Sequence, residues 1–193
     1  ASYKAIEQLQ IPEKTALALF MDKEEVGSMG NTGMQSKVLE DVLFDLSTVL
    51  GCSAPASKVF YASEALSADV SPALDPTWDS VMDDLNSARL GGGVCITKYT
   101  GSRGKSGASE AHAEFTAKVR RIFNQNKVIW QIGQLGKVDA GGGGTIAQFL
   151  ANLNMDVIDC GVPVLSMHSP FEITSKADVF MGCRAYKAFW ESI

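Results

Sequence analysis

Acidic side chains gather directly after an apolar run near the start of the chain. The run Ala16–Met21 leads into Asp22, and Glu24 and Glu25 follow before the chain turns at Gly27. Carboxylates this close repel one another, so a shared site needs a Lys or Arg side chain or a metal ion to offset their charge. If a metal ion is present, one glutamate can bind it while the other stays free as a general base.

Two further polar side chains follow later apolar runs. Asp69 comes a few residues after the predicted strand Lys58–Ser63, and His168 lies near the end of the run Val162–Ser169. Ligands in open α/β sheets gather at the carboxyl ends of strands. Carboxylate and imidazole groups suit zinc, manganese or cobalt. We therefore expect these two side chains and the glutamate pair to meet around one cleft.

A purely structural role competes with each of these assignments. Acids in loops are usually solvated, a histidine after a strand more often supports the fold than binds a metal, and Asp22 fits a turn or a cap. His112, between Glu110 and Glu114, is expected on the surface of a helix. The glycine run in Val138–Phe149 lacks the known phosphate-binding patterns, so it indicates close backbone approach rather than a nucleotide site.

Apolar runs alternate with amphipathic ones along the whole chain. Strands are predicted over Thr15–Asp22, Lys58–Ser63, Gly93–Tyr99, Lys127–Gly133, Met155–Gly161 and Val162–Ser169. Helices are predicted over Met34–Leu50, Ser109–Asn126, Gly144–Leu153 and Ser175–Ser192. This alternation predicts an α/β fold with a mixed, partly parallel sheet flanked by helices. The stretch Ala65–Ser87 is predicted as a long, functional loop.

Composition limits the class of protein. The 193 residues are 46% hydrophobic, which is enough for one globular domain with a core. The net charge of −5 disfavours binding to nucleic acid or to an anionic membrane. The sequence has no apolar run of about 18 residues, and it shows no signal-peptide pattern. Its four cysteines are widely separated, as is typical of a reducing compartment, so a cytoplasmic location is expected.

Four motifs together resemble the M18 metalloaminopeptidases, the aspartyl-aminopeptidase-like group. They are Asp22–Gly33, Ser67–Asp69, Asp139–Ala147 and Val162–Glu172. The likeness extends along nearly the whole chain, and the Ser-Met-His-Ser element favours M18 over other zinc aminopeptidases that share Glu-Glu-Val-Gly. It implies a zinc-aminopeptidase-like fold and a two-metal hydrolase that releases N-terminal residues from peptides. It also implies a large homo-oligomer at full length, often a dodecamer.

The resemblance assigns a role to each site residue. Glu24 matches the catalytic general base, and Glu25 and His168 match ligands of one metal ion. Asp69 matches a ligand of the second metal ion. Zinc is the expected metal, with cobalt and manganese as alternatives, and the free α-amine of the substrate is expected to anchor near the metal ions.

The chain also departs from the family pattern. The family's histidine ligand and bridging aspartate lie upstream of the glutamate pair, and no counterpart precedes Glu24 here. The family's separate dimerisation domain is likewise absent. We therefore interpret residues 1–193 as the C-terminal part of an incomplete catalytic domain. Taken alone, this part is expected to lack activity and to have mobile or distorted loops after Asp22 and Asp69.

Substrate preference is the least determined property. Lys98 and Met167 are expected to contact substrate, but Pro72 and Lys105 stand where members acting on acidic N-terminal residues carry His and Tyr. A bacterial-type branch is therefore indicated. Two other hypotheses stay open: a related metal-dependent carboxypeptidase or deacylase, and a non-catalytic assembly domain that has kept the fold.

Overall fold

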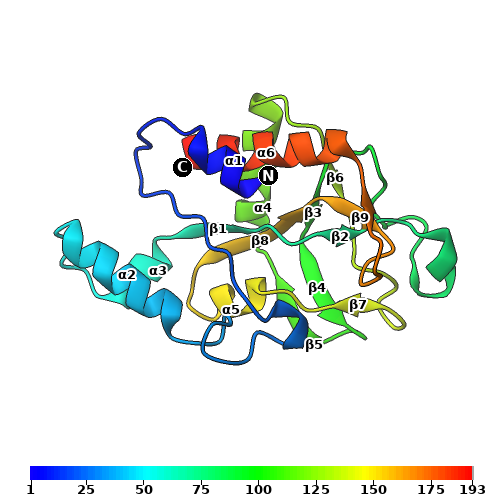
Figure 1. The fold of residues 1–193 in the computed structure, drawn as a ribbon, viewed down its shortest axis with the longest axis horizontal. Coiled ribbons are helices and arrows are strands. Elements are labelled where there is room, and N and C mark those ends of the chain that lie inside the picture. The colour runs from blue at the N-terminus through cyan, green and yellow to red at the C-terminus, as the bar shows by residue number, and fades with distance from the viewer. Residues whose placement is uncertain (193) are drawn as a thin grey trace.

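A four-stranded mixed sheet forms the centre of the molecule (Figure 1). The structure is a computed structural model that describes residues 1–192. In spatial order the strands are β1 (Glu64–Ser67), β8 (Asp156–Gly161), β3 (Val94–Thr97) and β6 (Trp130–Ile132). The β1·β8 and β3·β6 pairs are parallel and β3·β8 is antiparallel. The predicted mixed, partly parallel sheet is thereby confirmed.

Two small sheets extend this centre. One has the order β10 (Ile173–Thr174), β9 (Pro163–Leu165) and β2 (Ser71–Pro72), and the other β5 (Ser106–Glu110), β4 (Tyr99–Ser102) and β7 (Gly142–Gly143). Strand β7 belongs to the glycine run. A Cβ atom on Gly142 would lie 2.2 Å from the carbonyl oxygen of Gly101, so only glycine lets the two backbones come this close. The expectation of close backbone approach is correct.

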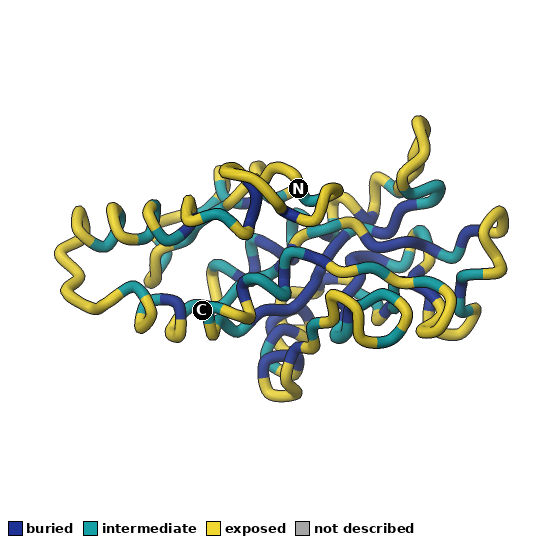
Figure 2. Tube along the Cα trace, turned by 90° about the horizontal axis from the view of Figure 1, so that it is seen from below, coloured by how far each residue is buried: buried dark blue, intermediate teal, exposed yellow. Residues whose placement is uncertain are grey.

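Helices cover both faces of the central sheet. Helices α1 (Ser2–Glu7), α4 (Ala113–Gln125) and α6 (Lys176–Glu191) cover one face, and α2 (Val38–Val49), α3 (Ala56–Tyr61) and α5 (Ala147–Ala151) belong to the other side (Figure 1). Consecutive residues of a strand point to opposite faces. Accordingly Ile158 packs in the cluster with Phe123 and Phe189, whereas Val157 packs with Leu39 and Phe60. Figure 2 shows the buried trace concentrated in the sheet and much of the α2–α3 end exposed.

Two predicted strands are wrong. Residues 15–22 form no strand, because the neighbouring sheet edge does not pair with them. Lys58–Ser63 lies mostly within helix α3, which follows Pro55, a residue whose fixed φ and missing N–H suit a helix start. The strand expected there begins instead at Glu64. Within Ala65–Ser87, the predicted loop contains the rest of β1, then β2 and the 3₁₀-helix η2 (Pro76–Val81).

Helix α4 begins later than predicted, with His112 as its N-cap. The His112 Nδ1 atom accepts the Phe115 N–H at 3.2 Å, and the Nε2 atom lies 2.8 Å from Asp156 Oδ1. The side chain is half-exposed, as expected for a surface histidine. The hydrogen bond to Asp156 raises the pKa of His112, with Glu114 adding to the effect against desolvation. Within residues 1–192, no helix is long and apolar enough to cross a membrane.

A pH-dependent contribution to stability follows from the ion pairs of His112 with Asp156 and Glu114. Because the folded pKa of His112 is raised, its ion pairs stabilise fully below the unfolded value of 6.5 and are lost as pH rises through the folded pKa. We expect His112→Asn, which keeps a capping group but loses the charge, to be less stable than the parent at about pH 5.5, by about 0.2–1 kcal/mol. The difference in the free energy of unfolding between parent and variant should be smaller at about pH 8.5. Urea unfolding at both pH values measures it, and a gap that widens with pH would contradict the assignment.

Candidate active site

The paired glutamates lie on the short 3₁₀-helix η1 (Glu24–Val26). Its entry is fixed by a left-handed backbone at Lys23, with φ of 64°, and by the Ser28 N–H donating to the Lys23 carbonyl at 2.7 Å. Such a tight loop turns neighbouring side chains in different directions. Glu24 is half-buried, whereas the side chain of Glu25 is 73% exposed. The chain then continues through residues 27–37 into α2. The loop that carries η1 is therefore held between the Lys23 turn and helix α2.

Asp69 lies in the connection between β1 and β2. The parallel register pairs Ser67 with Asp159, so Asp69 and Gly161 lie two residues farther along their strands, at the same edge. A Cβ atom on Gly161 would lie 1.4 Å from the Asp69 carbonyl oxygen. Glycine at position 161 therefore allows the backbone of Asp69 to rest directly against β8. The Val70 N–H donates to Asp69 Oδ1 at 2.8 Å and limits the side chain further.

We expect Gly161→Ala to displace Asp69 and to destabilise the fold. A methyl group cannot enter without moving backbone atoms, and such overpacking costs about 1–3 kcal/mol. Gly143→Ala is the matched control, because a Cβ atom there meets nothing within 4 Å. Urea unfolding of both variants measures the difference. Equal midpoints would mean that β1 and β8 adjust easily and that Gly161 does not place Asp69.

His168 reaches the site from the turn after β9. Its Nε2 atom lies 3.2 Å from Glu25 Oε2, although 143 residues separate the two in the chain (168 − 25). Both Ser166 and His168 have left-handed backbones, with φ of 57° and 66°. The His168 N–H donates to Glu172 Oε1 at 2.6 Å. Met167, between Ser166 and His168, is half-buried. The structure brings two of the predicted ligands, Glu25 and His168, into direct contact.

The four side chains share one electrostatic neighbourhood. Burial raises the pKa of Glu24 most, and the charges of Asp69 and Glu25 raise it further, while His168 opposes them. Burial is also the main cause of the raised pKa of Asp69, with Glu25 contributing and the Val70 N–H opposing. Carboxylates that are hard to ionise at one sheet edge are typical of a site built to work with a cation.

A fifth carboxylate, Asp159, was not identified from the sequence. It is buried on β8, where its Oδ2 atom accepts the Thr145 hydroxyl at 3.0 Å. Burial raises its pKa to about 6, against the hydrogen bond from Thr145 and with help from the charges of Asp69 and Glu24. The available signal was an aspartate inside an otherwise apolar strand. Its side chain is buried, unlike those of Glu25 and His168.

Metal binding by these residues is incomplete. Glu25 and His168 offer carboxylate and imidazole donors of the kind that zinc takes, and they already lie within contact distance. Across residues 1–192, however, no three His, Cys, Asp or Glu side chains come close enough together to hold a metal ion. Catalytic zinc normally has three protein ligands. The donors fit zinc in type but not in number.

Lys98 is occupied by a different partner. Its Nζ atom pairs with the Glu110 carboxylate, which joins the residue between β3 and β4 to the end of β5. Among residues 1–192, no hydrogen bond or ion pair links Lys98 to Glu24, Glu25, Asp69 or His168. A role in substrate binding therefore stays a prediction for Lys98, as it does for Met167.

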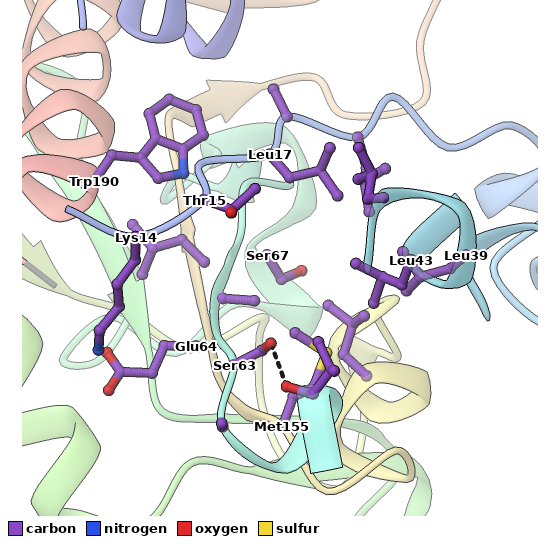
Figure 3. A pocket seen from close by; sticks show the side chains of 18 of the residues that line it. Lys14, Thr15, Leu17, Leu39, Leu43, Ser63, Glu64, Ser67, Met155 and Trp190 are labelled. Carbon is purple, nitrogen blue, oxygen red and sulfur yellow. Dashed lines mark hydrogen bonds between the residues drawn. The ribbon is translucent and has the colours of Figure 1, made fainter. Parts of the chain in front are cut away.

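A large apolar cleft lies beside the site and contains none of the four predicted site residues. Its volume is about 510 Å³, and residues from the unpaired stretch 14–21, β1, α2, α3 and the end of α6 line it. Leu17, Leu39, Leu43 and Trp190 surround the space in Figure 3. The cleft reaches the site at Ser67 and Ala68, just before Asp69, and at Met21, just before the loop that carries η1. Its apolar lining suits packed polypeptide better than the polar chemistry of peptide hydrolysis.

Comparison with known proteins decides the family. Residues 2–190 match the family described as Aminopeptidase I zinc metalloprotease (M18). The chain belongs to the M18 family. It is 50% identical over 190 residues to the probable M18 family aminopeptidase 1 of Clostridium acetobutylicum, covering 97% of this chain. The crystal structure of an M18 aminopeptidase from Thermotoga maritima superposes with a TM-score of 0.94 at 44% identity, covering all of this chain. By its description, this is a family of zinc metalloproteases.

The M18 relatives are much longer than this chain. It spans 41% of the Clostridium relative and 43% of the Thermotoga chain. A solved structure from Saccharomyces cerevisiae, described as the mApe1 dodecamer, superposes with a TM-score of 0.69 at 25% identity. The match supports zinc as the metal of the family, and the alternative hypotheses of a carboxypeptidase, a deacylase or an assembly domain are not favoured.

Proposed function

We propose that this chain is the C-terminal part of a two-metal aminopeptidase that removes N-terminal residues from peptides. One observation carries the proposal: half-buried Glu24, with its raised pKa, lies beside the contact between Glu25 and His168 in an M18 chain. Glu25 and His168 would hold one zinc ion and Asp69 the second. The remaining ligands would come from polypeptide that the longer relatives have in addition to the matched region. Full-length protein would act as a homo-oligomer.

The residues of this chain support a hydrolysis in which Glu24 moves the proton. Zinc, when bound, supplies a Lewis acid that polarises the peptide carbonyl and eases ionisation of water. The Glu24 carboxylate accepts a proton from the attacking water as the oxygen bonds to the carbonyl carbon. It then gives this proton to the leaving amine as the C–N bond breaks. The raised pKa of Glu24 brings it closer to neutral pH and suits it to both transfers.

A chimera tests this function. The matched segment of the Clostridium acetobutylicum relative is replaced by this chain, so that the rest of the relative supplies the missing ligands. We expect the purified chimera to release N-terminal residues from peptides with a free α-amine and to leave N-acetylated peptides intact. A chelator should remove the activity and zinc should restore it. A chimera that folds and assembles like the relative but cleaves only at the C-terminus, or not at all, would contradict the proposal.

A further inference from the structure

The turn that carries His168 has an unfavourable backbone. Ser166 and His168 both take left-handed conformations, which are unfavourable for residues other than glycine. Such a turn persists only where its surroundings hold it. The exposed Glu172 side chain accepts the His168 N–H at 2.6 Å. An exposed hydrogen bond holds His168 only weakly, so a buried hydrogen bond at the other left-handed residue, Ser166, would be the firmer anchor.

That anchor is Asp75. Its Oδ2 atom accepts the Ser166 N–H at 2.8 Å, across 91 residues of sequence. Asp75 is only 5% exposed, whereas the His168 side chain is 68% exposed. A hydrogen bond from a backbone N–H to an ionised carboxylate is stronger than a neutral one. These bonds, from Thr77 first and from Ser166 next, hold the pKa of Asp75 below its ordinary value.

Asp75 is itself held in place on its other side. Its Oδ1 atom accepts the Thr77 N–H at 2.9 Å and the Thr77 hydroxyl at 2.6 Å, which caps the start of η2. The Ala73 N–H donates to the Val164 carbonyl at 2.8 Å, and β2 pairs with β9 just before it. Both carboxylate oxygens of Asp75 therefore accept hydrogen bonds. The Oδ1 atom accepts from the start of η2, and the Oδ2 atom accepts from the turn after β9.

We propose that Asp75 is a positioning residue that sets the place of His168 relative to Asp69 and Glu25. Asp75 lies six residues after Asp69 on the same segment (75 − 69), and it holds the turn whose histidine contacts Glu25. The carboxylate thereby couples the two loops that carry predicted ligands. The inference rests on the proposed function for its catalytic meaning, but the coupling itself is a property of this chain.

Two variants separate this role from simple capping of η2. Asp75→Asn replaces one acceptor oxygen by an NH₂ group, so it cannot satisfy both Ser166 and Thr77. Thr77→Ala removes only the exposed hydroxyl on the η2 side and leaves the Ser166 bond intact. In this chain, amide exchange at Ser166 should be about 10- to 100-fold faster in Asp75→Asn, which is the effect of losing a hydrogen bond to a charged group. In Thr77→Ala it should change little.

The histidines provide a second readout that needs no activity. The chain has only two, and His112→Asn assigns the remaining imidazole signal to His168. The His168 signal should shift in Asp75→Asn and stay in place in Thr77→Ala. In the chimera, Asp75→Asn should weaken zinc binding by about 10- to 100-fold, with excess zinc restoring kcat. Unchanged Ser166 exchange, an unmoved His168 signal or parental zinc affinity would each overturn the inference. An inactive parent chimera would count against the proposed function. The amide-exchange and imidazole measurements would still decide whether Asp75 positions His168.

Discussion

Replacing Glu24 by Gln in the chimera is expected to lower kcat by about 10²–10⁴-fold, the usual contribution of a positioned general base. Gln keeps the size of the side chain but cannot take a proton from water. Zinc content should stay near that of the parent, because Glu24 is not one of the proposed ligands. Steady-state kinetics and metal analysis on the same preparations measure both quantities.

Glu25→Gln is the matched comparison on the neighbouring position. Glu25 contacts His168, so loss of its charge should weaken zinc binding as well as turnover. Excess zinc should therefore recover part of the activity of Glu25→Gln and none of that of Glu24→Gln. Turnover of Glu24→Gln within a few-fold of the parent would show that another group is the base.

The isolated 193-residue chain is expected to have no measurable aminopeptidase activity. Glu25 and His168 give one ion two protein ligands and Asp69 gives the other ion one, where catalytic zinc normally has three. Glu24 and Asp69 would then face each other with no cation to offset their charge. Titrating the purified chain with excess zinc, cobalt or manganese, beside an assay on aminoacyl substrates, tests this directly. Stoichiometric tight binding of two ions with turnover would mean that the missing ligands lie within the chain.

The contact between Glu25 and His168 joins two segments that the sequence marked as candidates, whereas two predicted strands beside them are wrong. Paired acids before a glycine, and a histidine after an apolar run, indicate a site because the chemistry needs those groups close together. The predicted strand 15–22 failed because an apolar run forms a strand only where another strand pairs with it. The predicted strand 58–63 failed because the helix start at Pro55 outweighed the apolar composition.

The supporting residues could not be found from local spacing at all. Asp75 accepts a hydrogen bond from a backbone N–H group 91 residues away, and Asp159 accepts one from the hydroxyl group of Thr145, 14 residues away. Neither contact leaves a periodic or compositional pattern in the sequence. The pairing of β2 with β9 brings Asp75 to Ser166, and the packing of α5 on β8 brings Thr145 to Asp159.

The unpaired edge of β1 affects how this chain behaves at high concentration. Within residues 1–192, one side of β1 has no partner strand, and the apolar cleft lies along it. An open edge of this kind is a template for pairing with any other extended chain. Closure by polypeptide of the same molecule does not depend on concentration, whereas pairing with a second copy speeds up as copies accumulate. A high concentration of this chain therefore favours edge-to-edge pairing between copies.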